Sequence, residues 1–256
     1  MKIGILLSVR EKATRLPGKV LKKIIDKSVT EHLISRLKMA DNVDKIIIST
    51  SVNKQDDVFE DIASSTGVEV FRGSEDDKLL RYLQTANEYN LDAVIIVDGD
   101  DILCFPEFIT NTAKALRDDK DADVIFTQGL PLGAAASGLK KRALEKVILL
   151  KDENDTEVWG GYFTTGNNFK VRYLQAKGIF RNSNIRMTLD YSEDLLFFET
   201  IFNKLYMKNK NFSSSDVMDL LVNKHPEICD LTVDAQKKYE KHISIAAKVK
   251  FKKEEE

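Results

Sequence analysis

Short apolar runs alternate with segments of helical periodicity along the first part of the chain. The runs are rich in Ile, Val and Leu and lie at residues 3–7, 46–48, 68–71, 93–97, 124–126 and 147–150. Between the early runs, apolar residues recur at helical spacing over residues 20–39, 54–66 and 76–90. Strands that alternate with helices predict βαβ units around a mostly parallel central sheet, and therefore an α/β fold.

The pattern changes after residue 126. Residues 127–183 are rich in small and aromatic side chains, which predicts an antiparallel flap, a lid or a subunit interface. The chain then returns to an expected strand ending at Asp190 and an amphipathic helix, and residues 213–256 predict C-terminal helices and a charged, frayed tail. Because no linker divides these segments, we expect a single domain over residues 1–256.

Composition restricts the partners and the compartment. The 256 residues include 39 Lys and Arg against 41 Asp and Glu, a formal net charge of -2, so the overall charge indicates neither nucleic acid nor a membrane surface as partner. No apolar run approaches the roughly 18 residues of a membrane span, and we expect a cytoplasmic protein. The two cysteines and three histidines lack the spacing of a zinc site.

Charged residues follow three of the predicted strands. These are Arg10, Arg15 and Lys19 after the first strand, Asp98, Asp100 and Asp101 after the fourth, and Asp190 after the late strand. Ligands of open α/β sheets bind beyond the carboxyl ends of the strands. Cations that face carboxylates there suit a metal-bound polyphosphate, because carboxylates hold Mg²⁺ and Arg and Lys neutralise phosphates.

Each of these signals has a plainer alternative. The basic residues can form a solvated loop, and the Asp190 segment can simply begin a helix. Gly18-Lys19 is followed by Val20, which excludes a P-loop, and no GxGxxG follows the first strand, which excludes a dinucleotide fingerprint. The occurrence of the basic and acidic groups together favours the polyphosphate interpretation.

Four blocks of the sequence resemble one family. They are "SVREKATRLPGKVL" (8–21), "FRGSEDDKLLRYLQTANEY" (71–89), "VDGDDILCFPEFI" (97–109) and "IRMTLDYSEDLLFFETIF" (185–202). In this order they are similar to blocks of the cytidylyltransferases of the spore coat polysaccharide biosynthesis protein F type, relatives of the 3-deoxy-manno-octulosonate and acylneuraminate cytidylyltransferases. Lys12 and Ala13 stand where the family has Gly-Ser, and Ile102 where it has Pro.

The resemblance implies a nucleotide-diphospho-sugar transferase (Rossmann-like) fold and roles for individual residues. It implies that Arg10, Arg15 and Lys19 bind the triphosphate of CTP and that Asp100 and Asp190 hold the catalytic Mg²⁺. It also implies that residues near the cytidine are Arg72, Ser74, Glu75 and Asp76. If these cations bind phosphate, they have no buried protein partner when the nucleotide is absent. We therefore expect Arg15 and Lys19 to contribute little to the stability of the unliganded protein.

The implied reaction is the Mg²⁺-dependent transfer of CMP from CTP to an acceptor oxygen, with release of pyrophosphate. The expected acceptor is an acidic sugar for a cell-surface glycan, and a homodimer through the aromatic "WGGYF" of 159–163 is possible if that segment is exposed. Two alternatives stay open. "DGD" at 98–100 also fits the metal motif of a glycosyltransferase of the same fold, and a non-catalytic homologue could keep the fold.

Overall fold

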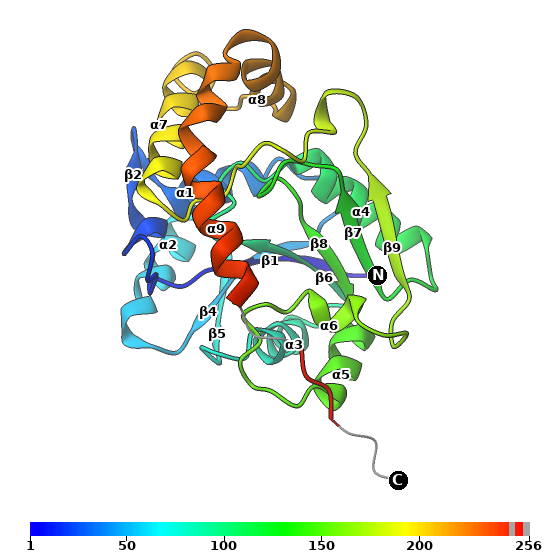
Figure 1. Cartoon of the computed structure of the whole chain (residues 1–256). Coiled ribbons are helices and arrows are strands. Elements are labelled where there is room, and N and C mark those ends of the chain that lie inside the picture. Colours follow the sequence, from blue (N-terminus) through cyan, green and yellow to red (C-terminus); the bar gives the residue numbers. More distant parts are fainter. Residues whose placement is uncertain (246–248, 253–256) are drawn as a thin grey trace.

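A seven-stranded sheet forms the centre of the structure, a computed structural model that describes residues 1–245 and 249–252 (Figure 1). Its strands, in spatial order, are β5 (Glu69–Gly73), β4 (Lys45–Ser51), β1 (Ile3–Ser8), β6 (Ala93–Asp98), β8 (Ser137–Lys140), β7 (Val124–Gln128) and β9 (Val171–Gln175). Only β8 runs antiparallel to its neighbours in this sheet. The prediction of a mostly parallel sheet flanked by helices is confirmed.

Helices cover both faces of the sheet because its central strands are apolar on both sides. In β1, Ile5 and Leu7 belong to one apolar core and the intervening Leu6 to the other. The first core is closed by α1 (Val29–Leu37), α2 (Val58–Thr66) and α4 (Pro106–Asp118). The second is closed by α3 (Lys78–Glu88), α5 (Lys141–Leu150) and α6 (Gly161–Thr164).

A third apolar cluster forms a helical lobe beyond the end of the sheet. Its buried side chains include Phe197, Phe198 and Phe202 from α7, which pack with Ile102 and Met187. The lobe comprises α7 (Ser192–Leu205), α8 (Ser214–Asp219), turns at Leu220–Lys224 and Pro226–Thr232, and the start of α9 (Val233–Ile245). From this lobe α9 extends across the front of the sheet toward α3 (Figure 1).

The helix expected over residues 20–39 is shorter than the pattern predicted. A 3-10 turn (Lys19–Leu21) and a small hairpin of β2 (Lys23–Ile24) and β3 (Lys27–Ser28) precede α1. The helix begins after Ser28, whose side chain and that of Glu31 form a capping box. Ile24 is apolar because it is buried against the α7 lobe, and its position in the sequence happens to match the spacing of a helix.

Two predicted strands are also corrected. The apolar run 147–150 is the last turn of α5, whose periodicity a four-residue window cannot reveal. The segment before Asp190 is extended but lies outside the sheet. It bonds to loops instead, since Leu132 N–H donates to Ile185 O at 2.9 Å and Leu189 N–H donates to Asp100 O at 2.9 Å.

The middle and C-terminal segments are more closely integrated than the sequence indicated. Residues 127–183 contain the whole of α5 and α6 and supply β8 and β9 to the central sheet. Trp159, Tyr162 and Phe163 are buried in the core, so the condition for a dimer interface through "WGGYF" is not met. Of the expected frayed tail, residues 250–252 pair with 150–152, while 246–248 and 253–256 lie outside the described residues. Within the described parts of the chain, the helices are too short or too polar to cross a bilayer.

His32 makes the packing of α1 against α7 sensitive to pH. Its ring lies 4.4 Å from that of Phe202, and Nε2 bonds to Ile24 O at 2.7 Å. Burial lowers the pKa of His32 below its ordinary 6.5, although the bond to Ile24 and the nearby Asp26 and Glu31 oppose this shift. A lowered folded pKa means that the stabilisation is complete above about pH 6.5 and is lost as the pH falls below it.

We therefore expect the free energy of unfolding to fall from pH 7.5 to pH 5.5 by a larger amount in the wild type than in His32→Gln. One protonation contributes at most about 1.4 kcal/mol per pH unit. Urea denaturation at the two pH values measures the difference, and His225→Gln, at a partly exposed histidine, is the matched control. Equal losses in the wild type and His32→Gln would show that other groups cause the dependence.

Candidate active site

A cleft of about 610 Å³ opens at the carboxyl ends of β1 and β6. Parallel pairing of these strands, with Ser8 beside Asp98, brings the basic loop of residues 9–19 next to the acidic residues 98–101. Other walls come from residues 75–81, 132–133, 155–158 and 188–190, and from Tyr239 and His242 of α9. The cleft is therefore built by segments from almost the whole chain.

Lys19 lies between the two carboxylates that the sequence indicated as metal ligands. Its Nζ donates to Asp100 Oδ2 at 2.8 Å, to Asp190 Oδ1 at 2.9 Å and to Leu189 O at 2.7 Å. Gly18 adopts a left-handed conformation with φ 63°, which turns the chain so that Lys19 enters the cleft. The expectation that Lys19 has no buried protein partner is wrong, because Asp190 is only 2% exposed.

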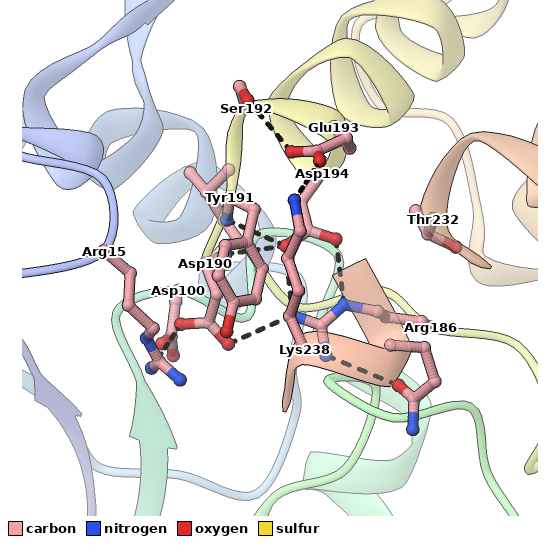
Figure 2. A network of polar contacts seen from close by, with 12 residues as sticks. Arg15, Asp100, Arg186, Asp190, Tyr191, Ser192, Glu193, Asp194, Thr232 and Lys238 are labelled. Carbon is pink, nitrogen blue, oxygen red and sulfur yellow. Dashed lines mark hydrogen bonds and ion pairs between the residues drawn. The ribbon is translucent and has the colours of Figure 1, made fainter. Parts of the chain in front are cut away.

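Three cations contact Asp190, and Figure 2 shows two of them, Arg15 and Arg186. Besides Lys19, Arg15 donates to Oδ1 at 2.6 Å, and Arg186 donates to Oδ2 at 3.0 Å. The expectation for Arg15 is thus corrected as well. A carboxylate that loses its hydration on burial needs such partners to remain charged.

Arg186 is itself fixed by a second carboxylate, Asp194 in the first turn of α7. The guanidinium donates to the two carboxylate oxygens at 2.8 and 3.0 Å, and both side chains are almost fully buried. Asp194 also accepts the backbone N–H groups of Asp190 and Tyr191, at 2.9 and 3.0 Å (Figure 2). The start of α7 therefore sets the position of Asp190, and Asp190 does not itself cap the helix.

A second chain of charges crosses the cleft from the basic loop to the acidic strand end. Arg10 donates to Glu157 Oε2 at 2.6 Å, Glu157 pairs with Lys78 at 3.0 Å, and Lys78 reaches Asp98 at 3.4 Å. Sequence reasoning missed Lys78 and Glu157. Lys78 directly follows the "SEDD" block and could have been found there, whereas Glu157 lies in a loop without any motif.

Residues expected near the cytidine separate into two groups. Glu75 and Asp76 line the cleft, and Glu75 O accepts a hydrogen bond from Arg10 at 3.0 Å. Arg72 instead bonds to Ser51 O at 3.1 Å and to Glu60 at 2.7 Å, which directs it toward α2 and away from the cleft. Ser74 uses its hydroxyl to accept the Asp77 N–H at 3.1 Å, a structural contact at the start of α3.

Charges in the cleft shift one another's proton affinities. Burial works to raise the pKa of Asp100, but the ammonium of Lys19 outweighs it and holds that pKa below its ordinary value. Burial likewise works to lower the pKa of Lys19, and Asp100 and Asp190 reverse this to a raised pKa. Burial and the neighbouring Asp100 and Asp98 raise the pKa of Asp101 well above the ordinary value. Lys19 and Asp100 are thus both charged at neutral pH.

The donor set fits a hard divalent cation. Asp100 and Asp190 offer carboxylate oxygens to one point, which an ammonium occupies in this structure. Mg²⁺ typically binds through one or two carboxylates together with water and substrate phosphates, so two protein ligands suffice. Within residues 1–245 and 249–252, no group of three or more Asp, Glu, His or Cys forms a complete cage. A metal here would therefore complete its coordination with other oxygens.

The region beside α9 differs from the basic loop. Tyr239 and His242 line the cleft from α9, while Leu132, Gly133 and Thr188 line it from nearby loops. Arg186 connects this wall to the acidic centre, because its Cζ lies 4.8 Å from the Tyr239 ring centroid. This part of the cleft thus carries fewer charged side chains than the basic loop does.

An α/β fold with cations and carboxylates gathered beyond the carboxyl ends of its parallel strands is typical of a protein that binds a phosphorylated ligand. The family model for cytidylyltransferases matches residues 3–212. An uncharacterised protein of Methanocaldococcus jannaschii is 30% identical over 245 residues, 93% of this chain and 97% of the relative. The chain belongs to the cytidylyltransferase family, and it is a CTP-dependent nucleotidyltransferase.

Further similarities agree with this assignment. The spore coat polysaccharide biosynthesis protein SpsF of Bacillus subtilis is 26% identical over 229 residues, 87% of this chain and 94% of that protein. A solved cytidylyltransferase structure from Leptospira borgpetersenii superposes with a TM-score of 0.81 at 26% identity, covering 90% of this chain and 97% of that one. The resemblance seen in the sequence is confirmed, and the glycosyltransferase and non-catalytic alternatives are set aside.

The Arg186–Asp194 pair supplies the first test of the site. Arg186→Met leaves the carboxylate of Asp194 buried without its counter-ion, and we expect a loss of roughly 3–5 kcal/mol in the free energy of unfolding. Lys114→Met, which removes an exposed partner of Asp118, is the control and should change stability by less than about 0.5 kcal/mol. Urea denaturation measures both variants. A loss in Arg186→Met no larger than in the control would contradict the assigned role.

Proposed function

We propose that the cleft binds CTP through the basic loop and transfers CMP to an acceptor oxygen, with pyrophosphate as the leaving group. The acceptor oxygen attacks the α-phosphorus, and the bond between that phosphorus and the bridging oxygen to the β-phosphate breaks. The observation that supports this most directly is the convergence of Lys19, Asp100 and Asp190 at one point. Lys19, a cation for the phosphates, thus lies within hydrogen-bonding distance of both carboxylates proposed to bind the metal.

Each wall of the cleft has a separate part in this proposal. Arg10, Arg15 and Lys19 are proposed to bind and orient the triphosphate. Glu75 and Asp76 line the same cleft, and we assign them to the nucleoside. Mg²⁺ held by Asp100 and Asp190 would neutralise the charge that develops on the phosphates during transfer. Positioning and charge neutralisation account for most catalysis of this kind, so no covalent intermediate on the protein is needed.

The acceptor is proposed to be an acidic sugar used for a cell-surface glycan. This proposal relies on the resemblance to cytidylyltransferases that act on eight- and nine-carbon acidic sugars. Tyr239, His242 and Thr188 line the same cleft, and we propose that the acceptor binds beside them. Pyrophosphate release, measured with each of the four nucleoside triphosphates, Mg²⁺ and a panel of acidic sugars, tests both the nucleotide and the acceptor.

CTP with Mg²⁺ should stabilise the protein against heat more than ATP, GTP or UTP does. A ligand that binds only the native state adds about 2.7 kcal/mol of stability at a hundredfold excess over its Kd. Differential scanning fluorimetry with the four nucleotides at equal concentration gives the comparison. Equal shifts for all four, or no shift with CTP, would be incompatible with the proposed specificity.

Asp100→Asn and Asp190→Asn should each abolish pyrophosphate release with the acceptor that the panel identifies. An amide keeps the size of the side chain but lacks the negative charge that a hard divalent cation requires. Asp26→Asn, at an exposed carboxylate that pairs with Lys210, is the control and should retain activity. Near-normal turnover in Asp190→Asn would remove this residue from the proposed metal site, and circular dichroism spectra of the variants establish that the fold is kept.

A further inference from the structure

The ammonium of Lys19 occupies the position that a cation bound by Asp100 and Asp190 would take. Three oxygens surround Nζ at 2.7 to 2.9 Å, from the two carboxylates and the carbonyl of Leu189. The side chain is only 12% exposed, so the ammonium has exchanged most of its hydration for these contacts. A divalent metal and Lys19 therefore compete for the same carboxylate oxygens.

The cations around Asp190 differ in their freedom to leave it. Arg186 is 2% exposed and is held by two bonds to Asp194, so its contact to Oδ2 is fixed by the packing of the α7 lobe. Lys19 and Arg15 instead extend from the loop between β1 and α1, and both meet Oδ1. One carboxylate oxygen is thus fixed by Arg186, and the other is shared by side chains that can turn toward a ligand.

We propose that Lys19 is a resident counter-ion that leaves Asp100 and Asp190 when phosphate oxygens accept its ammonium, so that the divalent metal and the triphosphate bind as a cooperative pair. This rests on the proposed function of the cleft as a metal and triphosphate site. Without phosphate, a metal must displace the ammonium from three oxygens at 2.7 to 2.9 Å, and no phosphate oxygens replace the contacts that it loses. With phosphate present, Lys19 gains charge-assisted hydrogen bonds as it leaves.

The cooperativity must be reciprocal because it is a property of binding free energies. If bound triphosphate raises the affinity for the metal by a given factor, the bound metal raises the affinity for triphosphate by the same factor. Couplings of this kind are typically 5- to 150-fold. Arg186 acts here as a positioning residue, since it fixes Asp190 while Lys19 moves.

Lys19→Met separates the two binding events, because it removes the competing charge and the phosphate donor together. We expect Mn²⁺ alone to bind Lys19→Met at least about fivefold more tightly than the wild type, as competition is lost. In EDTA, inorganic tripolyphosphate should bind the same variant about tenfold or more weakly. Electron paramagnetic resonance of free Mn²⁺ and calorimetry with tripolyphosphate provide the two affinities.

Lys12→Met is the matched control. Lys12 belongs to the same loop and lines the same cleft, but it pairs with Glu75 at 3.1 Å instead of with Asp100 or Asp190. Its removal deletes the same charge without freeing the proposed metal ligands, so Mn²⁺ affinity should change by less than about twofold. An equal gain in both variants would overturn the proposal, because it would indicate a general change of charge in the cleft.

Opposite changes in the two affinities are the signature of a displaced counter-ion. Unchanged Mn²⁺ affinity in Lys19→Met would make Lys19 a phosphate ligand only, and weaker binding of both probes would make it a structural residue; either result overturns the proposal. If Lys19→Met does not fold, Lys19→Gln replaces it and must show the same opposite changes. Neither probe contains a base or an acceptor, so a failure of CTP specificity leaves this test unaffected.

Discussion

Burial of the carboxylate of Asp190 imposes the constraint on which the site depends. A charged group without hydration requires counter-charges, and Asp190 receives them from Arg15, Lys19 and Arg186. Arg15 and Lys19 are remote in the sequence from Arg186 and Asp190, since Lys19 and Asp190 are separated by 171 positions. Forming the site therefore requires that the central sheet, the basic loop and the α7 lobe assemble together.

The fold meets this constraint through two different kinds of structure. Parallel pairing of β1 and β6 places the basic loop beside Asp100 with the accuracy of a hydrogen-bonded register. Asp190 lies outside the sheet, and its position comes from Asp194, which binds Arg186 and two backbone N–H groups at the start of α7. In the cleft between them, the cations and carboxylates neutralise each other.

Local patterning predicted the central elements of the fold and failed where tertiary packing overrode it. Buried strands such as β1 and β6 were evident as apolar runs because both of their faces are covered. Ile24 imitated helical spacing although it lies in a hairpin, since its burial depends on the α7 lobe. The run 147–150 imitated a strand because a short apolar segment does not reveal its period.

By itself, the sequence determined which charged residues the site would contain. It placed cations after one strand and carboxylates after another, and both groups lie in blocks that resemble one family. It could not determine which charges pair, because pairing depends on distances between segments remote in the chain. Only the tertiary structure placed Lys19 between Asp100 and Asp190 and brought Glu157 to Lys78. The tertiary structure also directs Arg72 away from the cleft, because its guanidinium makes its hydrogen bonds to residues of the β4–α2 region.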